Sequence, residues 1–147
     1  MNMVSFNTTL RAAITNYAPI NVWAQAEYSK NHDFLSRADK KYAPEEGDCP
    51  VCALTPASRN VGQESREVRC SFALDLLVYD SSSKGFENVE TYRKLIEDAV
   101  VAAIAGTNVS LVGVDVSYEL DEDFPFLWCG TMMNFKETAY IGKNPLS

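Results

Sequence analysis

The sequence of 147 residues predicts a single α+β domain over residues 1–147. We expect a mainly antiparallel sheet of about four or more strands, with two helices packed on one face and a long loop after the first strand. Two observations predict this class. Apolar residues recur at helical spacing in two segments, and they alternate with polar residues in four others. With 46% hydrophobic and 22% charged residues, the chain is long enough to bury one core.

The first predicted helix comes from the N-terminal apolar spacing of i, i+3, i+4 and i+7. It is formed by Leu10, Ala13, Ile14 and Tyr17. Ser5 or Asn7 is available as the N-cap, and the helix is expected to end before Pro19, which cannot continue it.

The first predicted strand is residues 20–28, where apolar and polar residues alternate. This alternation puts Trp23 on the polar face of the strand. Because a large ring on such a face is costly unless it is covered, we expect a neighbouring subunit or a loop of the chain to bury it. Trp23 is therefore an interface candidate.

Residues 29–68 are polar, contain several prolines and glycines, and show no periodicity. We predict a long loop or arm, because so long an irregular stretch inside a compact domain is usually functional or flexible. The alternative is a solvent loop without a role. Its charged interface candidates are Asp33, Asp39, Lys40, Lys41, Glu45 and Glu46.

The C-terminal half continues with strand, helix, strand and strand. Residues 67–79 are a predicted strand whose alternation places Cys70 on an apolar face. The next predicted helix is capped by Asn88 and ends at Gly106. Two further strands, 111–120 and 125–139, are joined by an acidic turn. The first of them is expected to have one continuous apolar face, formed by Val112, Val114, Val116, Tyr118 and Leu120. That turn contains the last interface candidates, Asp121, Glu122 and Asp123. It lacks the ligand pattern of a calcium loop, so we expect a solvated turn.

Cys49 and Cys52 have the C-x2-C spacing with which two thiolates can bind one zinc ion. A closed site would need two more ligands, for which His32 and Cys70 are the candidates. Using Cys70 would pull it off its apolar face, so the preferred interpretation is a loop turn with two ordinary thiols. We therefore predict no metal and no cofactor, and expect serine at both positions to cost within about 0.5 kcal/mol.

Charge and composition exclude several functions. One histidine and no glycine-rich phosphate loop leave general acid–base and nucleotide chemistry without their usual groups, so an enzyme is not expected. A net charge of −7 gives no reason to bind nucleic acid. Without a signal sequence or an apolar run of about 20 residues, we expect a soluble intracellular protein with no membrane partner.

The chain resembles the tail terminator (tail completion) proteins of long-tailed bacteriophages. Three stretches carry the resemblance. They are residues 10–14 of the opening helix, the helix from Tyr92 to Ile104 after the strand from Phe72 to Tyr79, and the C-terminal stretch that begins with residues 124–128 and ends with residues 135–138. The likeness covers most of the chain outside residues 29–68. The Cys49 and Cys52 pair is not part of it.

The resemblance implies a ring, usually of six subunits, at the head-proximal end of the tail tube. Such a ring stops tube polymerisation and provides the head-joining surface. Its partners would be further copies of itself, the tube protein and a head-completion or neck protein. DNA would pass through it without specific binding. The location would be the virion tail, assembled in the host cytoplasm. Alternatives are a tail tube or neck/head-completion subunit, or a small cytoplasmic metal- or partner-binding module.

Overall fold

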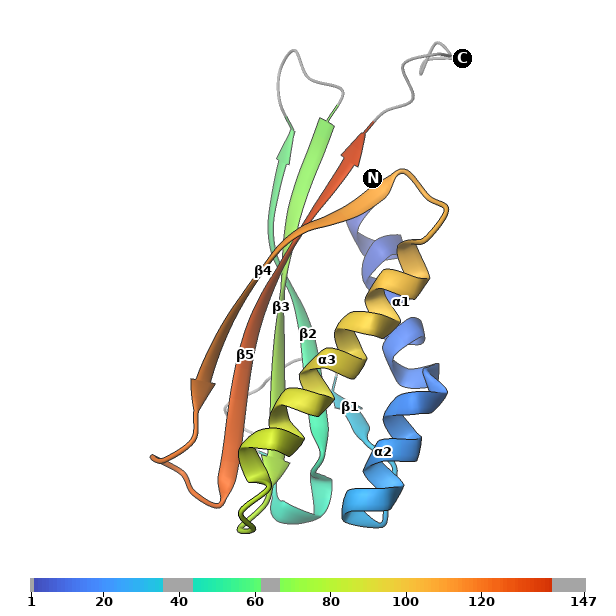
Figure 1. The fold of residues 1–147 in the computed structure, drawn as a ribbon. Coiled ribbons are helices and arrows are strands. Elements are labelled where there is room, and N and C mark those ends of the chain that lie inside the picture. Colours follow the sequence, from blue (N-terminus) through green and yellow to red (C-terminus); the bar gives the residue numbers. More distant parts are fainter. Residues whose placement is uncertain (1, 36–43, 62–66, 139–147) are drawn as a thin grey trace.

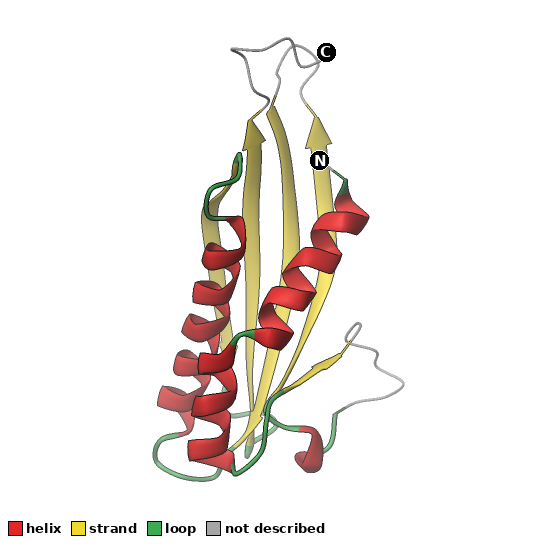
Figure 2. Cartoon of the chain, turned by 90° about the vertical axis from the view of Figure 1, so that its right-hand side faces the viewer, coloured by secondary structure: helices red, strands yellow, loops and turns green. Residues whose placement is uncertain are grey.

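The computed structural model describes residues 2–35, 44–61 and 67–138. It confirms the α+β class: a five-stranded sheet carries α1, α2 and α3 on one face, and no α-helix of the described residues covers the other face (Figure 1, Figure 2). The elements are α1 (Met3–Asn16), α2 (Ala18–Tyr28), β1 (Asp33–Leu35), η2 (Glu46–Asp48), β2 (Val51–Val61), β3 (Glu67–Tyr79), α3 (Gly85–Ile104), β4 (Val109–Glu119) and β5 (Phe126–Thr138).

The strand order in the sheet is β1-β2-β3-β5-β4, so β1 and β4 are the edge strands. Only β1 is parallel to its neighbour, and its three residues pair with Val51–Ala53 of β2. The remaining pairs are antiparallel, and β3 lies in the centre with an unbroken register of 13 residues against β5. Among the described residues, the part of β2 that follows Ala53 therefore has a strand on one side only.

The main core lies between the sheet and the helices. Alternate residues of β3 and β5 point into it, as period-two strands require. On β3 these are Cys70, Phe72, Leu74, Leu76 and Val78, and on β5 they are Leu127, Cys129, Met133 and Phe135. The predicted placement of Cys70 on a buried apolar face is confirmed, and Cys129 lies in the same core. A second, small cluster of Cys49, Val51 and Leu77 lies on the helix-free face.

Helix α1 has the predicted apolar stripe, but it begins earlier than expected. Its N-cap is Asn2, whose side-chain oxygen accepts a hydrogen bond from the backbone N–H of Ser5 at 3.1 Å. Neither Ser5 nor Asn7 is the cap. Buried Phe6, Leu10 and Ile14 recur every four residues and face the sheet.

Residues 18–28 form helix α2, so the predicted strand is wrong. Pro19 lies in the first turn, where its missing N–H costs nothing, and this is the position at which proline favours a new helix. The two buried residues, Ile20 and Ala24, are spaced i, i+4 and not i, i+2. Tyr17 is extended and separates α1 from α2.

The predicted loop over residues 29–68 is also wrong for most of the residues that the structure describes. It contains β1, the short helix η2 and the 11-residue strand β2. From Thr55 to Asn60, β2 is half-buried or exposed, with a register shift between Pro56 and Ser58. A strand without a buried face has no alternation for sequence patterning to detect.

The segments 67–79 and 85–106 match their predictions closely. Helix α3 ends at the predicted place, with Gly106 in a left-handed conformation at φ 78°. Its start differs, because Asn88 lies inside the helix and its side chain is buried. The helix begins at Gly85, where a Cβ would lie 2.6 Å from Cδ1 of Leu127, so that a larger residue would force the Leu127 side chain to shift.

A buried carboxylate holds the turn between β3 and α3. Asp80 accepts hydrogen bonds from the Tyr28 hydroxyl at 2.8 Å and from the Asn88 amide at 3.0 Å. It also accepts one from the backbone N–H of Ser82 at 2.8 Å. Burial raises its pKa, but these hydrogen bonds outweigh that effect and hold the pKa below its ordinary value. Asp80 thus connects α2, β3 and α3.

Candidate interaction surfaces

Trp23 was predicted to need a partner because a strand would have exposed its ring. On helix α2 it instead stacks on Tyr92 of α3, with ring centroids 4.9 Å apart, and meets Tyr28 edge-on at 5.6 Å. The structure therefore packs Trp23 against the protein's own core. The reason for naming it an interface residue no longer holds.

His32 is buried beside the break between α1 and α2. Its Nδ1 lies 2.9 Å from the Tyr92 hydroxyl, and the ring also hydrogen-bonds the backbone of Ile14 and Thr15. The ring N–H therefore satisfies carbonyl groups that α1 leaves free where Pro19 interrupts the helix. Burial lowers the pKa of His32. The single histidine is a structural residue of the core.

Cys49 and Cys52 are buried, which corrects the prediction of a surface loop turn. Cys49 packs with Val51 and Leu77 on the helix-free face, whereas Cys52 belongs to the core between the sheet and the helices. The two thiols thus belong to different clusters, and the structure does not bring them together with His32 and Cys70. In the described parts of the chain, no three His, Cys, Asp or Glu side chains are grouped as metal ligands.

The buried thiols lead to a testable expectation. Burial raises the pKa of Cys49 and of Cys52 to about 12, so at pH 8 very little of either is the reactive thiolate. We expect iodoacetamide to alkylate the native protein at least about 100-fold more slowly than the urea-unfolded protein. Mass spectrometry would follow the labels, with four expected on the unfolded chain. Rapid labelling of Cys49 or Cys52 in the native state would contradict the buried placement.

The other charged interface candidates are partly described. Asp33 is exposed on β1 and lies 3.7 Å from Lys30, and Glu45 and Glu46 form the start of η2. Asp121, Glu122 and Asp123 are exposed, as predicted for a solvated turn. Asp39, Lys40 and Lys41 lie outside the described residues.

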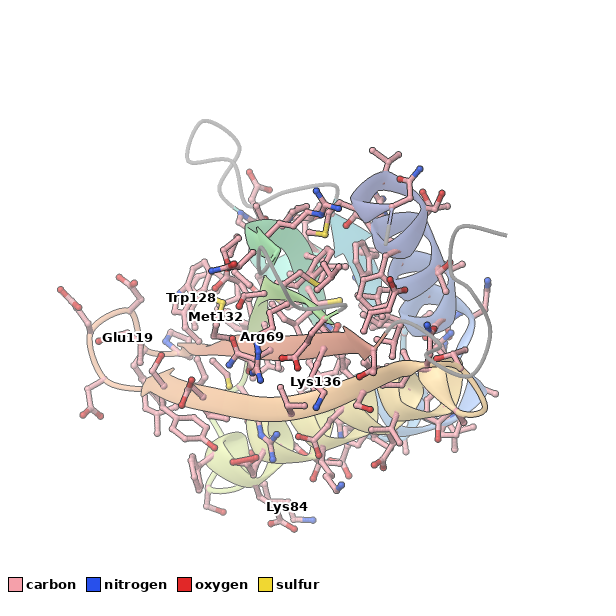
Figure 3. All side chains as sticks on the ribbon, turned by 90° about the horizontal axis from the view of Figure 1, so that it is seen from above. Arg69, Lys84, Glu119, Trp128, Met132 and Lys136 are labelled. Atoms are coloured by element: carbon pink, nitrogen blue, oxygen red, sulfur yellow. The ribbon has the colours of Figure 1, made fainter. Side chains whose placement is uncertain are left out.

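The helix-free face of the sheet has a hollow of about 280 Å³ at its centre. It lies where Gly130 of β5 faces Asp75 of β3 on one side and Ser117 of β4 on the other. Asp75 is half-buried, and this burial raises its pKa. Figure 3 shows Met132 and Trp128 on the same side of β5, away from α3. We call the side of the sheet that carries these residues the bare face.

The edge strand β4 carries apolar side chains that remain exposed. The register places Val116 and Tyr118 on the helix side, beside Thr131 and Cys129. Because β4 is the edge strand, both are exposed at 36% and 38%. Tyr118 meets Phe86 of α3 with ring centroids 5.2 Å apart, and Phe86 is itself 51% exposed. We call the outer edge of residues 114–119, together with Phe86, the β4 strip.

A bulge in β4 changes the predicted face of that strand. The register shifts between Leu111 and Gly113, so that Leu111 pairs with Phe135. Val112 is then left out of the alternation and is exposed. The expected continuous apolar face of β4 is broken at this point, as bulges do near sheet edges.

The protein's net charge is concentrated around the β4 strip. Residues 85–123, which are α3, β4 and the acidic turn, hold nine acidic and two basic side chains, a net charge of −7. The rest of the chain holds 11 of each sign and is balanced. Glu119 lies beside the projecting turn (Figure 3), and its hydrogen bond with Glu122 and the nearby acidic charges raise its pKa.

Comparisons with known proteins do not assign this chain to a family. No protein-family model matches the chain, and no curated protein is similar to it. One solved structure aligns with 90% of this chain and 96% of its own length, at 16% identity and a TM-score of 0.46. A likeness at this level carries no argument about function. Among the described helices, none is long and apolar enough to cross a membrane.

Proposed function

We propose that this protein is a structural subunit of a phage tail, which forms a ring at the head-proximal end of the tail tube. The ring stops tube polymerisation and offers the head-joining surface. This role follows from the resemblance to tail terminator proteins. The geometry supports a self-associating subunit through one observation in particular, the bare face of the sheet.

The bare face suits contact with another protein. Most side chains at its centre are small or apolar, and few are charged. Because Gly130 has no side chain, another chain can approach the sheet closely at this position. An antiparallel sheet can have one face exposed to water. On the bare face, however, Asp75 is half-buried, and this burial raises the pKa of its carboxyl group. A basic side chain from a neighbour would fit this hollow.

A second, different surface is available for the same ring. After Ala53, β2 has no described strand on its outer side, and strand edges accept further backbone hydrogen bonds. A ring needs heterologous contacts, in which one surface meets a different surface of the next copy. The bare face and the outer edge of β2 after Ala53, beside which no other described strand lies, are two such surfaces on one subunit.

The mass of the purified protein in solution would test this proposal. Six copies of a 16.3 kDa chain would give about 98 kDa. We expect Ala73→Arg, which places a long charged side chain in the hollow of the bare face, to shift the protein towards the monomer mass. Val22→Arg is the matched control, because Val22 lies on the helix layer and is 70% exposed. This substitution should leave the mass of the assembly in solution unchanged.

Two results would contradict the proposal. The first is a protein that remains at 16.3 kDa at every concentration at which it is soluble. The second is an assembly that the Ala73 and Val22 substitutions weaken equally, because the bare face would then have no particular role. Circular dichroism of both variants would establish that each one folds.

A further inference from the structure

The β4 strip has the geometry of a site for an added strand. Beyond the bulge, residues 114–119 pair regularly with β5 on one side and with no described strand on the other. The outer backbone groups of an edge strand can pair with an extended segment. At about 3.3 Å per residue, this edge is about 20 Å long.

Apolar surface continues outward from this edge. Tyr118 and Val116 face the helix side of β4, and Phe86 of α3 lies next to Tyr118 with half of its surface exposed. A hollow of about 470 Å³ adjoins Phe86 along α3. Alternate side chains of a strand added beside β4 would point towards this apolar surface. The strip therefore offers both backbone pairing and apolar contacts.

The charge of the surroundings identifies the chemistry of the segment. Glu87 and Glu90 border the hollow together with one basic residue, Lys94, and Asp115 and Glu119 project from β4. They belong to residues 85–123, which hold the whole net charge of −7. Such a field attracts basic partners and repels acidic ones. It also disfavours pairing of the β4 strip with the β4 strip of a second copy.

We propose that the β4 strip binds an extended, basic segment of another protein, which pairs with β4 as an additional strand. Its apolar side chains would contact Phe86 and Tyr118, and its lysine or arginine side chains would face the acidic groups. This inference goes beyond the proposed ring and does not depend on it. In a tail, the segment would belong to a protein that docks on the ring.

The probe for the test is an eight-residue peptide in which valine alternates with lysine and threonine. The control peptide carries glutamate in place of each lysine. Fluorescence anisotropy of the labelled peptides would measure binding to the full-length protein, and hydrogen exchange would locate the peptide. We expect the basic peptide to bind, to protect the amides of residues 114–119, and to bind at least about tenfold more weakly in 0.5 M than in 0.05 M salt.

Protein variants would test the two parts of the strip separately. Asp115→Asn with Glu119→Gln should weaken binding about fivefold, because each exposed charge contributes little alone. Phe86→Ser should weaken it in high salt as well as in low salt, because that contact is apolar. Val22→Ser, at an exposed site on α2, is the control and should bind as the unmodified protein does.

Three outcomes would overturn the inference. Equal binding of the basic and acidic peptides would remove the electrostatic argument. Protection of amides in β2 and not in β4 would place the peptide at the other edge. Mutual protection of β4 amides between two copies, with no peptide binding, would show that a second copy occupies the strip. None of these outcomes depends on whether the protein forms a ring.

Discussion

Phe72→Ala is expected to lower the free energy of unfolding by about 3–5 kcal/mol. Phe72 is completely buried at the middle of the central strand β3. Its ring meets Phe6 of α1 edge-on at 5.5 Å and Phe135 of β5 at 6.0 Å. Alanine would leave a cavity between the sheet and α1, and neither element can move in without breaking its other contacts. Urea unfolding followed by circular dichroism would measure the loss.

The same substitution at an exposed phenylalanine is the control for Phe72. Phe124 lies in the acidic turn and is 57% exposed, so Phe124→Ala should change the stability by no more than about 0.5 kcal/mol. Since domains of this size are stable by about 5–15 kcal/mol, the Phe72 variant loses a large part of its total stability. Similar losses in the two variants would mean that Phe72 is not at the centre of the core.

Asp80→Ala is expected to cost about 3 kcal/mol, because it removes a buried acceptor of several hydrogen bonds. The Tyr28 hydroxyl and the Asn88 amide would both be left without their partner. Tyr28→Phe removes only one of these bonds and should cost about 1–2 kcal/mol. Asp123→Ala, in the exposed turn, is the control and should be nearly neutral. Thermal or urea unfolding would rank the three variants.

Asp80 also predicts a pH dependence. Its pKa in the folded protein lies below the ordinary value of 3.8, so the unfolded chain binds this proton more readily. The contribution of Asp80 to stability is complete above the unfolded pKa and is lost as the pH falls through the folded pKa. We expect the stability of the unmodified protein to decline more steeply below about pH 4 than that of Asp80→Asn. Parallel curves for the two proteins would contradict this assignment.

Some elements could be predicted from sequence because their patterns are local. Strand β3 has the predicted bounds, since alternate residues from Cys70 to Val78 form a buried face. Helix α3 ends at Gly106 because glycine adopts the left-handed conformation that terminates a helix without steric cost. The acidic turn at 121–123 was also predicted correctly as exposed, because three adjacent carboxylates are solvated wherever the turn lies.

Other elements were decided by tertiary structure. In residues 20–28, the alternation of apolar and polar residues agrees with a strand. The stacking of Trp23 on Tyr92 and the i, i+4 burial of Ile20 and Ala24 instead require a helix. Pro19 was the one local signal that could have identified it. Strand β2 exists mainly because β3 provides backbone partners, and its outer half has no apolar face that a pattern could reveal.

The candidate surfaces also combine features that the sequence shows with features that only the tertiary structure decides. The sequence by itself determined the α+β class, the buried alternation of β3 and β5, and the excess of negative charge over residues 85–123. Only the tertiary structure decided that β4 is an edge strand, that Val116 and Tyr118 are therefore exposed beside Phe86, and that Cys49 and Cys52 lie on different sides of the sheet. The physical reason is that periodicity shows which residues share a face. Strand order and the packing of helices decide which faces and edges are covered.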